Sequence, residues 1–218
     1  MIKAVIFDLD GTLVNSLNDL AISTNYALTQ HGFKPHPVDA YKYFVGDGMV
    51  KLIERTIPSD SLNEETFKSV FECFMAYYRE NFLQNTVAYE GINDLLTLLL
   101  DMKLKLAVVS NKADSMTKRV VSEIFGDDIF SIVIGKCDSY PTKPNPTSTL
   151  EVMAKMGIKP QECVFVGDSG MDMLTAVNAG CYPLGVLWGF RTADELIKNG
   201  AKALAKTPSE IISIIKEI

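Results

Sequence analysis

Near its start the chain reads Ala4-Val-Ile-Phe-Asp8-Leu-Asp10-Gly11-Thr12. The apolar run Ala4–Phe7 is short and is followed at once by a turn signal, which predicts a fully buried strand rather than an amphipathic one. Asp8 would lie at the carboxyl end of this strand, where open parallel sheets bind their ligands. Asp10 would point the same way, and Gly11 would let the backbone fold back toward a bound group.

Two carboxylates so close together need a cation, a shared proton, or both, because like charges repel. A hard divalent cation with oxygen ligands, Mg²⁺ above all, meets that need, and a carboxylate beside it can act as a nucleophile toward phosphorus. A calcium-binding EF-hand loop is excluded, since its required sixth-position glycine, counted from Asp8, would fall on Leu13. The plainer alternative is a polar turn that closes a buried strand.

The composition is that of a soluble globular protein with room for a large core: 218 residues, of which 47% are hydrophobic and 22% charged. The net charge of −6 comes with no basic tract, which argues against a nucleic-acid partner. An anionic substrate remains open, because local cations or a metal can dominate a small pocket. The four cysteines are scattered, and the sequence shows neither a signal peptide nor a membrane span, so we expect a cytoplasmic protein.

Residues 15–84 have the pattern of an all-helical insertion. A helix is predicted over residues 16–30, and a capping box at Ser61-Leu-Asn-Glu64 predicts the start of another. An apolar stripe at helical spacing follows the box, and we assign it to the core of the insertion. The stripe consists of Phe67, Val70, Phe71, Phe74, Met75, Tyr78 and Phe82.

From Tyr89 onward, predicted strands alternate with predicted helices. The strands are 104–109, 132–135, 163–166, 184–187 and a short one near Ala203; the helices are 92–102, 113–125, 147–156, 171–179 and 209–216. This alternation is typical of βαβ units and a parallel sheet. The expected fold is therefore α/β, with a Rossmann-like parallel sheet core, helices on both faces and an inserted all-helical cap domain. Residues 1–14 and 85–218 would form the core, and residues 15–84 the cap.

Polar side chains follow three of the predicted strands, and a lysine lies in a proline-rich loop between two of them. They are Asp8 and Asp10, Ser110 and Asn111, Asp168 and Asp172, and the loop residue Lys143. Because the carboxyl ends of parallel strands face the same way, these groups should converge on one crevice. Such a set fits phosphoryl transfer, which needs a nucleophile, a metal, donors for the phosphoryl oxygens and a proton donor for the leaving group.

At these positions the chain resembles the haloacid dehalogenase superfamily of hydrolases, in its phosphoglycolate phosphatase-like branch. The four motifs of that superfamily occur here in order, at Asp8 to Thr12, Ser110, Lys143 and Gly167 to Asp172. The resemblance covers essentially the whole chain. It implies a phosphatase that hydrolyses a small phosphate monoester, such as 2-phosphoglycolate, through an aspartyl-phosphate intermediate.

The resemblance also implies a role for each motif residue. Asp8 would attack the phosphorus, and Asp10 would protonate the leaving group and then activate water. Ser110 and Lys143 would hold the phosphate, with Thr12 and Asn111 also at the substrate. Mg²⁺ would be held by the carboxylates of Asp8 and Asp168 and the backbone carbonyl of Asp10, with Asp172 supporting the site directly or through water. The expected partner is a small phosphorylated metabolite, and the protein would be a monomer or homodimer.

Two cap features resemble the same branch. Phe44-Val-Gly46-Asp-Gly48 would form a substrate loop, with an ordinary interhelical turn as the alternative. Arg55 is the best cap candidate for binding a substrate carboxylate, with a helix-surface cation as its alternative. One departure is Asn15, where relatives commonly carry Asp, and it puts in doubt a hydrogen bond at the hinge between core and cap.

Several alternatives stay open or are disfavoured. A pyrophosphatase or a β-phosphoglucomutase-like phosphotransferase would keep the same core residues. A non-enzymatic phospho-acceptor receiver domain would need neither the helical insertion nor Asp10. A serine hydrolase built on Gly167-Asp-Ser-Gly170 would need a histidine, and the two histidines, His31 and His36, both lie in the insertion.

Overall fold

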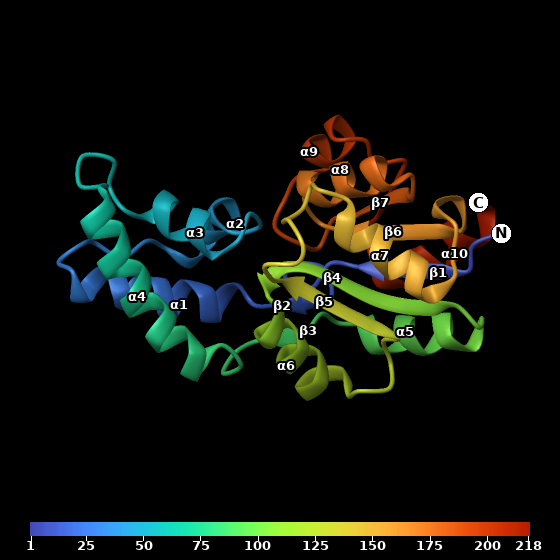
Figure 1. Ribbon diagram of the computed structural model, residues 1–218, viewed down its shortest axis with the longest axis horizontal. Coiled ribbons are helices and arrows are strands. Elements are labelled where there is room, and N and C mark those ends of the chain that lie inside the picture. Colours follow the sequence, from blue (N-terminus) through green and yellow to red (C-terminus); the bar gives the residue numbers. More distant parts are fainter. The chain divides into compact units, whose positions relative to one another are not determined.

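The structure is a computed structural model that describes residues 1–218 (Figure 1). The chain divides into two compact units. Met1–Val14 and Ala88–Ile218 form the first, which we call the α/β unit, and Asn15–Val87 form the second, which we call the helical unit. None of the helices combines the length and the apolar character needed to cross a bilayer.

A six-stranded parallel sheet forms the centre of the α/β unit, with the strand order β5-β4-β1-β6-β7-β8. The strands are β1 Ala4–Phe7, β4 Lys105–Ala113, β5 Ile132–Lys136, β6 Cys163–Gly167, β7 Tyr182–Val186 and β8 Ala203–Ala205. β1 lies in the middle of the sheet, and all its residues are buried. This position explains why its sequence is a continuous apolar run rather than an alternating one.

Helices cover both faces of this sheet (Figure 1). They are α5 Ile92–Asp101, α6 Asp114–Phe125, α7 Thr147–Met156, the 3₁₀ helix η2 Pro160–Glu162, α8 Gly170–Ala179, α9 Ala193–Lys198 and α10 Pro208–Glu217. Alternate residues of β1 serve the two faces. Ile6 joins side chains of α7 and α8 in one core cluster. Phe7 instead meets the edge of the Phe130 ring, with 6.5 Å between the ring centroids.

The strand order creates a topological switch point beside β1. From β1 the chain continues to β4 and β5 on one side, then crosses to β6 on the other side of β1 and continues outward to β7 and β8. The connections after β1 and β6 therefore leave in opposite directions, which opens a crevice at the carboxyl ends of these two strands. Asp8 and Asp168 directly follow these strand ends.

The helical unit is built around buried aromatic rings. Its elements are α1 Leu17–Gln30, η1 Val38–Ala40, α2 Tyr41–Phe44, α3 Met49–Thr56 and α4 Glu64–Asn81. Val70, Phe74, Tyr78 and Phe82 of the predicted stripe are buried. The rings of Phe74 and Tyr78 stack with centroids 5.2 Å apart. Phe67, Phe71 and Met75 are half-buried, so the assignment of the stripe to the core is confirmed for four of its seven residues.

The predicted capping box of α4 is wrong. The helix begins at Glu64, and its N-cap is Asn63, whose side-chain oxygen accepts the backbone N–H of Thr66 at 2.9 Å. Ser61 belongs to a preceding turn, in which its N–H donates to the carbonyl of Pro58 at 3.0 Å. Because Ser61 lies in this turn, Asn63 is the residue that caps the helix.

The boundary between the units falls inside two short strands, β2 Val14–Asn15 and β3 Val87–Ala88, which pair in a separate two-stranded sheet. Within the helical unit, the buried carboxylate of Asp19 accepts hydrogen bonds from Asn85 and Thr86 at 2.7–2.9 Å. These bonds attach residues 85 and 86 to the helical unit. The side-chain oxygen of Asn15 accepts the N–H of Leu17 at 3.3 Å, a bond that an aspartate there could also accept.

Two elements of the α/β unit differ from the sequence prediction. β4 continues past Val109 to Ala113, so Ser110, Asn111 and Lys112 belong to the strand rather than to a turn after it. The short helix α9 Ala193–Lys198 was not predicted, because six residues are too few for a helical period to stand out.

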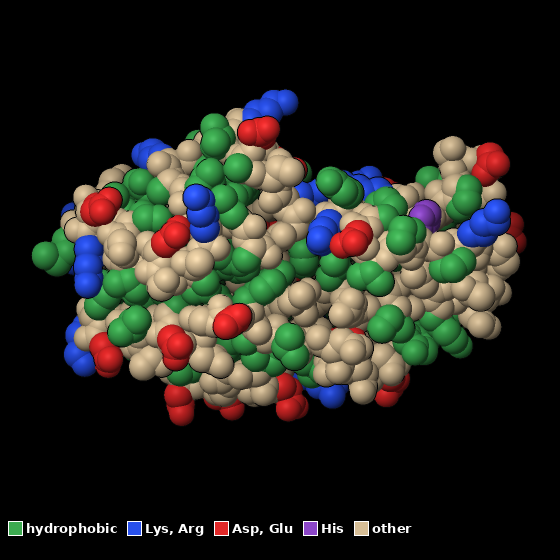
Figure 2. Space-filling model, turned by 180° about the vertical axis from the view of Figure 1, so that it is seen from behind, with side chains coloured by type: hydrophobic (Ala, Val, Ile, Leu, Met, Phe, Trp, Pro, Cys, Tyr) green, Lys and Arg blue, Asp and Glu red, His purple; other side chains and the backbone are tan.

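Acidic and basic side chains are interspersed on the face of the molecule seen in Figure 2.

We expect Asp19→Ala to lower the free energy of unfolding by about 2–3 kcal/mol, because it leaves the buried N–H of Thr86 without an acceptor and also removes the bonds from the more exposed Asn85. Urea denaturation would measure this loss. The control is Glu72→Ala on the exposed side of α4, which should change stability by less than about 0.5 kcal/mol. Equal effects of the two substitutions would show that the Asp19 bonds contribute nothing.

Candidate active site

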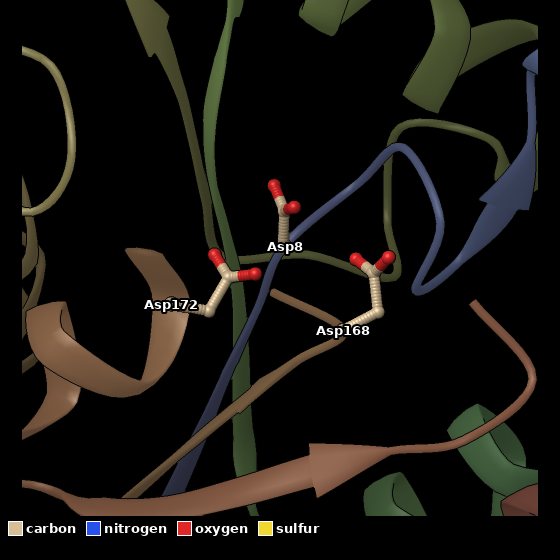
Figure 3. Close-up of side chains that lie close together, drawn as sticks. All are labelled: Asp8, Asp168 and Asp172. Carbon is tan, nitrogen blue, oxygen red and sulfur yellow. The ribbon is translucent and has the colours of Figure 1, made fainter. Parts of the chain in front are cut away.

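Three carboxylates meet at the switch point of the sheet (Figure 3). Asp8 directly follows β1, Asp168 directly follows β6, and Asp172 lies in the first turn of α8. All three are buried, and one oxygen of each lies within 4.8 Å of the others. The structure thus brings together three of the residues that the sequence predicts at a metal site.

Local structure orients Asp172. Ser169 is the N-cap of α8, and its hydroxyl and backbone N–H donate to Oδ2 of Asp172 at 2.6 and 3.0 Å. This reciprocal capping leaves Oδ1 of Asp172 for other partners. Gly167 makes the arrangement possible, since a Cβ there would come within 2.3 Å of the Asp172 side chain.

Lys143 connects two of the carboxylates. Its Nζ lies 2.7 Å from Oδ1 of Asp8 and 2.6 Å from Oδ1 of Asp172, and its side chain is 3% exposed. Asn111 of β4 fixes the backbone of this lysine: its side-chain oxygen accepts the Lys143 N–H at 2.8 Å, and its Nδ2 donates to the Lys143 carbonyl at 3.4 Å. Two hydrogen bonds to a strand residue therefore fix the position of Lys143 in its proline-rich loop.

Asp168 is oriented by two flanking turns. Oδ1 accepts the hydroxyl of Thr12 at 3.1 Å, and Oδ2 accepts the backbone N–H of Phe190 at 2.8 Å. Gly11 and Gly189 lie against it, and a Cβ on either would approach the Asp168 side chain to 2.4 Å or less. Thr12, which the sequence predicts at the substrate, thus contacts the carboxylate of Asp168. Phe190 binds the same carboxylate through its backbone N–H.

Burial and mutual repulsion shift the charges of this cluster. Burial and the neighbouring Asp172 raise the pKa of Asp8 well above its usual value, although Lys143 opposes the shift. The same two causes raise the pKa of Asp168 to about 7. Burial by itself would lower the pKa of Lys143, but the charges of Asp172 and Asp8 raise it, so this lysine stays an ammonium.

The cluster fits a hard divalent cation. Three ionised carboxylates and one ammonium leave two uncompensated negative charges in a buried site, and every candidate ligand atom is an oxygen. Burial and mutual repulsion raise the pKa of Asp8 and of Asp168, and these shifts favour the protonated carboxyl groups when no cation is bound. A divalent cation would remove the cost without protonation.

Asp10 lies outside the three-carboxylate cluster, and its partner is a residue that the sequence analysis did not select. Lys112 of β4 places its Nζ 3.1 and 3.3 Å from the two carboxylate oxygens of Asp10. Alternation along the strand does not identify Lys112, because the pairing of β4 with β5 is irregular between Val109 and Ala113. Ser110 is buried, and its hydroxyl oxygen accepts the Lys112 N–H at 3.2 Å.

The two predicted cap residues lie in the helical unit. Arg55 of α3 donates to the carbonyl of Phe44 at 3.0 Å and pairs with the carboxylate of Asp47. Gly46 has φ 110°, a conformation that favours glycine, which explains the residue without a substrate. A substrate carboxylate would have to share Arg55 with Asp47, and the roles of both cap residues stay predictions.

We expect a divalent cation to raise the melting temperature, and to raise it more at about pH 8 than at about pH 5, because protons compete with the cation for carboxylates. The raised pKa of Asp168, about 7, gives the direction. In the cation-free protein, the contribution of protonated Asp168 to the free energy of unfolding is present at low pH and is lost as the pH rises through about 7.

Melting curves with and without cation at both pH values would test this expectation. Asp168→Asn should abolish the cation-dependent shift, and Asp101→Asn, on the exposed end of α5, should retain it. A shift of the same size at both pH values would show that the cation binds elsewhere.

Comparison with known proteins agrees with this geometry. A family model described as haloacid dehalogenase-like hydrolase matches residues 5–186. The chain is 34% identical to the phosphoglycolate phosphatase of Chromobacterium violaceum, over 99% of this chain and 97% of the relative, and 34% identical to that of Neisseria meningitidis, over 100% and 92%. A crystal structure from Lactobacillus delbrueckii subsp. bulgaricus superimposes with a TM-score of 0.92 at 31% identity, covering 98% of each chain. The chain therefore belongs to the haloacid dehalogenase-like hydrolases, an enzyme family whose fold it shares.

Proposed function

We propose that this protein is a Mg²⁺-dependent phosphatase that hydrolyses a small phosphate monoester, with 2-phosphoglycolate as the first candidate, through an aspartyl-phosphate. The observation that carries the proposal is the buried group of Asp8, Asp168, Asp172 and Lys143 at the switch point of the sheet. The names of the curated relatives support the choice of substrate.

In the first step Asp8 attacks the phosphorus, so that a bond forms between its carboxylate oxygen and phosphorus while the bond to the ester oxygen breaks. Asp10 donates a proton to the departing alkoxide. In the second step water attacks the phosphorus, Asp10 takes a proton from it, and the carboxylate of Asp8 is released with inorganic phosphate. Asp10 gives up a proton in the first step and regains one in the second, so it ends the cycle in its starting protonation state.

The remaining residues position the phosphoryl group and offset its negative charge. Lys143 fixes one oxygen of Asp8 and carries the positive charge nearest to it, so it also opposes the charge that develops on the phosphoryl group. Ser110 and the backbone N–H of Asn111 lie within β4, two and three residues beyond Val108, the last residue of β4 that pairs with β1, and there they would bind phosphoryl oxygens.

Mg²⁺ would be held by the carboxylates of Asp8 and Asp168 and the backbone carbonyl of Asp10, with Asp172 as a further or water-mediated ligand. When bound, it acts as a Lewis acid that neutralises the phosphoryl charge. We propose further that the helical unit is a cap that selects the substrate, with Gly46 and Arg55 in its binding loop. Closure of a cap would exclude bulk water from the phosphoenzyme.

The test is phosphate release from a panel of 2-phosphoglycolate, pyrophosphate, β-glucose 1-phosphate, a nucleoside monophosphate and p-nitrophenyl phosphate. We expect release with Mg²⁺, none with EDTA, and the highest kcat/KM on 2-phosphoglycolate. Asp8→Asn should lower kcat at least about a thousandfold, because it removes the nucleophile. Asp101→Asn, on the exposed end of α5, should match the wild type.

Other outcomes would separate the alternatives. Faster release from another ester would keep the mechanism and replace the substrate, and preference for pyrophosphate would indicate a pyrophosphatase. A stable phosphorylated Asp8 without phosphate release would contradict the phosphatase and favour a mutase or a receiver.

A further inference from the structure

Lys112 and Asp10 form an ion pair within the α/β unit. The side chain of Lys112 is 2% exposed, and its Nζ contacts both carboxylate oxygens of Asp10, at 3.1 and 3.3 Å. A buried ammonium lowers the stability of the fold unless it is paired with a negative charge. The carboxylate of Asp10 supplies that charge for Lys112.

The backbone of Lys112 is held firmly. Its N–H donates to the hydroxyl oxygen of Ser110 at 3.2 Å, and its carbonyl accepts the hydroxyl of Thr117 at 3.1 Å. Lys112 also lies within β4, next to the strand that ends in Asp8. The ammonium is therefore presented from a fixed point of the sheet rather than from a loose loop.

Asp10 is less constrained. Its side chain is 19% exposed, in a tight turn where the N–H of Gly11 donates to the carbonyl of Val14 at 2.8 Å. A partly exposed carboxylate at such a position can rotate toward solvent. Contact of one ammonium with both of its oxygens limits that rotation, because turning the carboxylate would lengthen at least one contact.

The two buried lysines divide the acidic groups between them. Lys143 contacts Asp8 and Asp172, whereas Lys112 contacts Asp10. The group assigned to attack phosphorus and the group assigned to move protons thus have separate cationic partners.

We propose that Lys112 is a positioning residue that holds the carboxylate of Asp10 in place for both proton transfers. This inference rests on the proposed phosphatase function and on the acid/base role of Asp10. Proton transfer requires the donor and acceptor to be within hydrogen-bond reach, so an Asp10 that rotates away loses most of its contribution.

The test compares two phosphate esters. 2-Phosphoglycolate releases an alkoxide that needs a proton, whereas p-nitrophenyl phosphate releases a stable phenolate that does not. In Lys112→Met we expect kcat on 2-phosphoglycolate to fall by about a hundredfold, with KM nearly unchanged, because acid catalysis contributes about 10²–10⁴-fold. With p-nitrophenyl phosphate, stopped-flow measurement should show a burst of about one nitrophenol per enzyme and then slow turnover, because hydrolysis of the phosphoenzyme needs Asp10 as base.

Matched variants make the result specific. Asp10→Asn should give the same burst and the same kinetic pattern, and the double variant Asp10→Asn/Lys112→Met should be no slower than Asp10→Asn alone, because both changes remove one function. Lys112→Gln keeps a donor of similar length without the charge, and it should show the burst if Lys112→Met does not fold. Lys118→Met changes an exposed lysine of α6 that forms an ion pair with its neighbour Asp114, and it should behave as the wild type.

Three results would overturn the inference in a protein whose wild type is active: unchanged kinetics in folded Lys112 variants, an equal loss on both esters without a burst, or a double variant that is slower by the product of the single losses. The second result would place Lys112 on the phosphate instead. An inactive wild type would refute the proposed phosphatase function itself, and with it this inference.

Discussion

The interaction on which the site depends is the contact of the Lys143 ammonium with Asp8 and Asp172, at 2.7 and 2.6 Å. Without it, three buried carboxylates would lie within 4.8 Å of one another with no internal counter-charge. Burial strengthens both the repulsion among the carboxylates and their attraction to the lysine, because water no longer screens either. Lys143 therefore lets a strongly acidic site exist in the folded chain, yet leaves it negative enough to attract a cation.

This balance depends on backbone features at some distance in the sequence. Asn111 fixes the loop that carries Lys143, and Ser169 turns one oxygen of Asp172 away from the lysine. Gly167 and Gly189 leave room for carboxylates that any side chain would displace. Neutral groups thus orient the charged residues, in addition to the ion pairs that Lys143 makes.

The helical unit has a separate structural basis. Its core contains stacked and edge-on aromatic rings, and the buried carboxylate of Asp19 accepts hydrogen bonds from the neutral donors of Asn85 and Thr86. Those bonds fasten the returning chain at residues 85 and 86 beside the start of α1. The bonds of Asp19 therefore join the beginning of the helical unit to its end.

The sequence by itself determined the parts of this protein that follow from local chemistry. A buried apolar run ending in Asp8 predicts a central parallel strand, and alternating strands and helices predict the α/β fold, because both depend on period and burial along a single segment. Asp8 and Asp168 could be placed at one crevice for the same reason.

Only the tertiary structure decided which groups pair. The contact of Lys112 with Asp10 joins residues 102 positions apart and depends on how β4 extends beside β1, which alternation within one strand does not reveal. The choice of Asn63 over Ser61 as helix cap, by contrast, depended on a local turn from Pro58 to Ser61 and not on a distant segment. Pairing between distant residues is a property of segments brought together by the fold, so it has no signature in either segment alone.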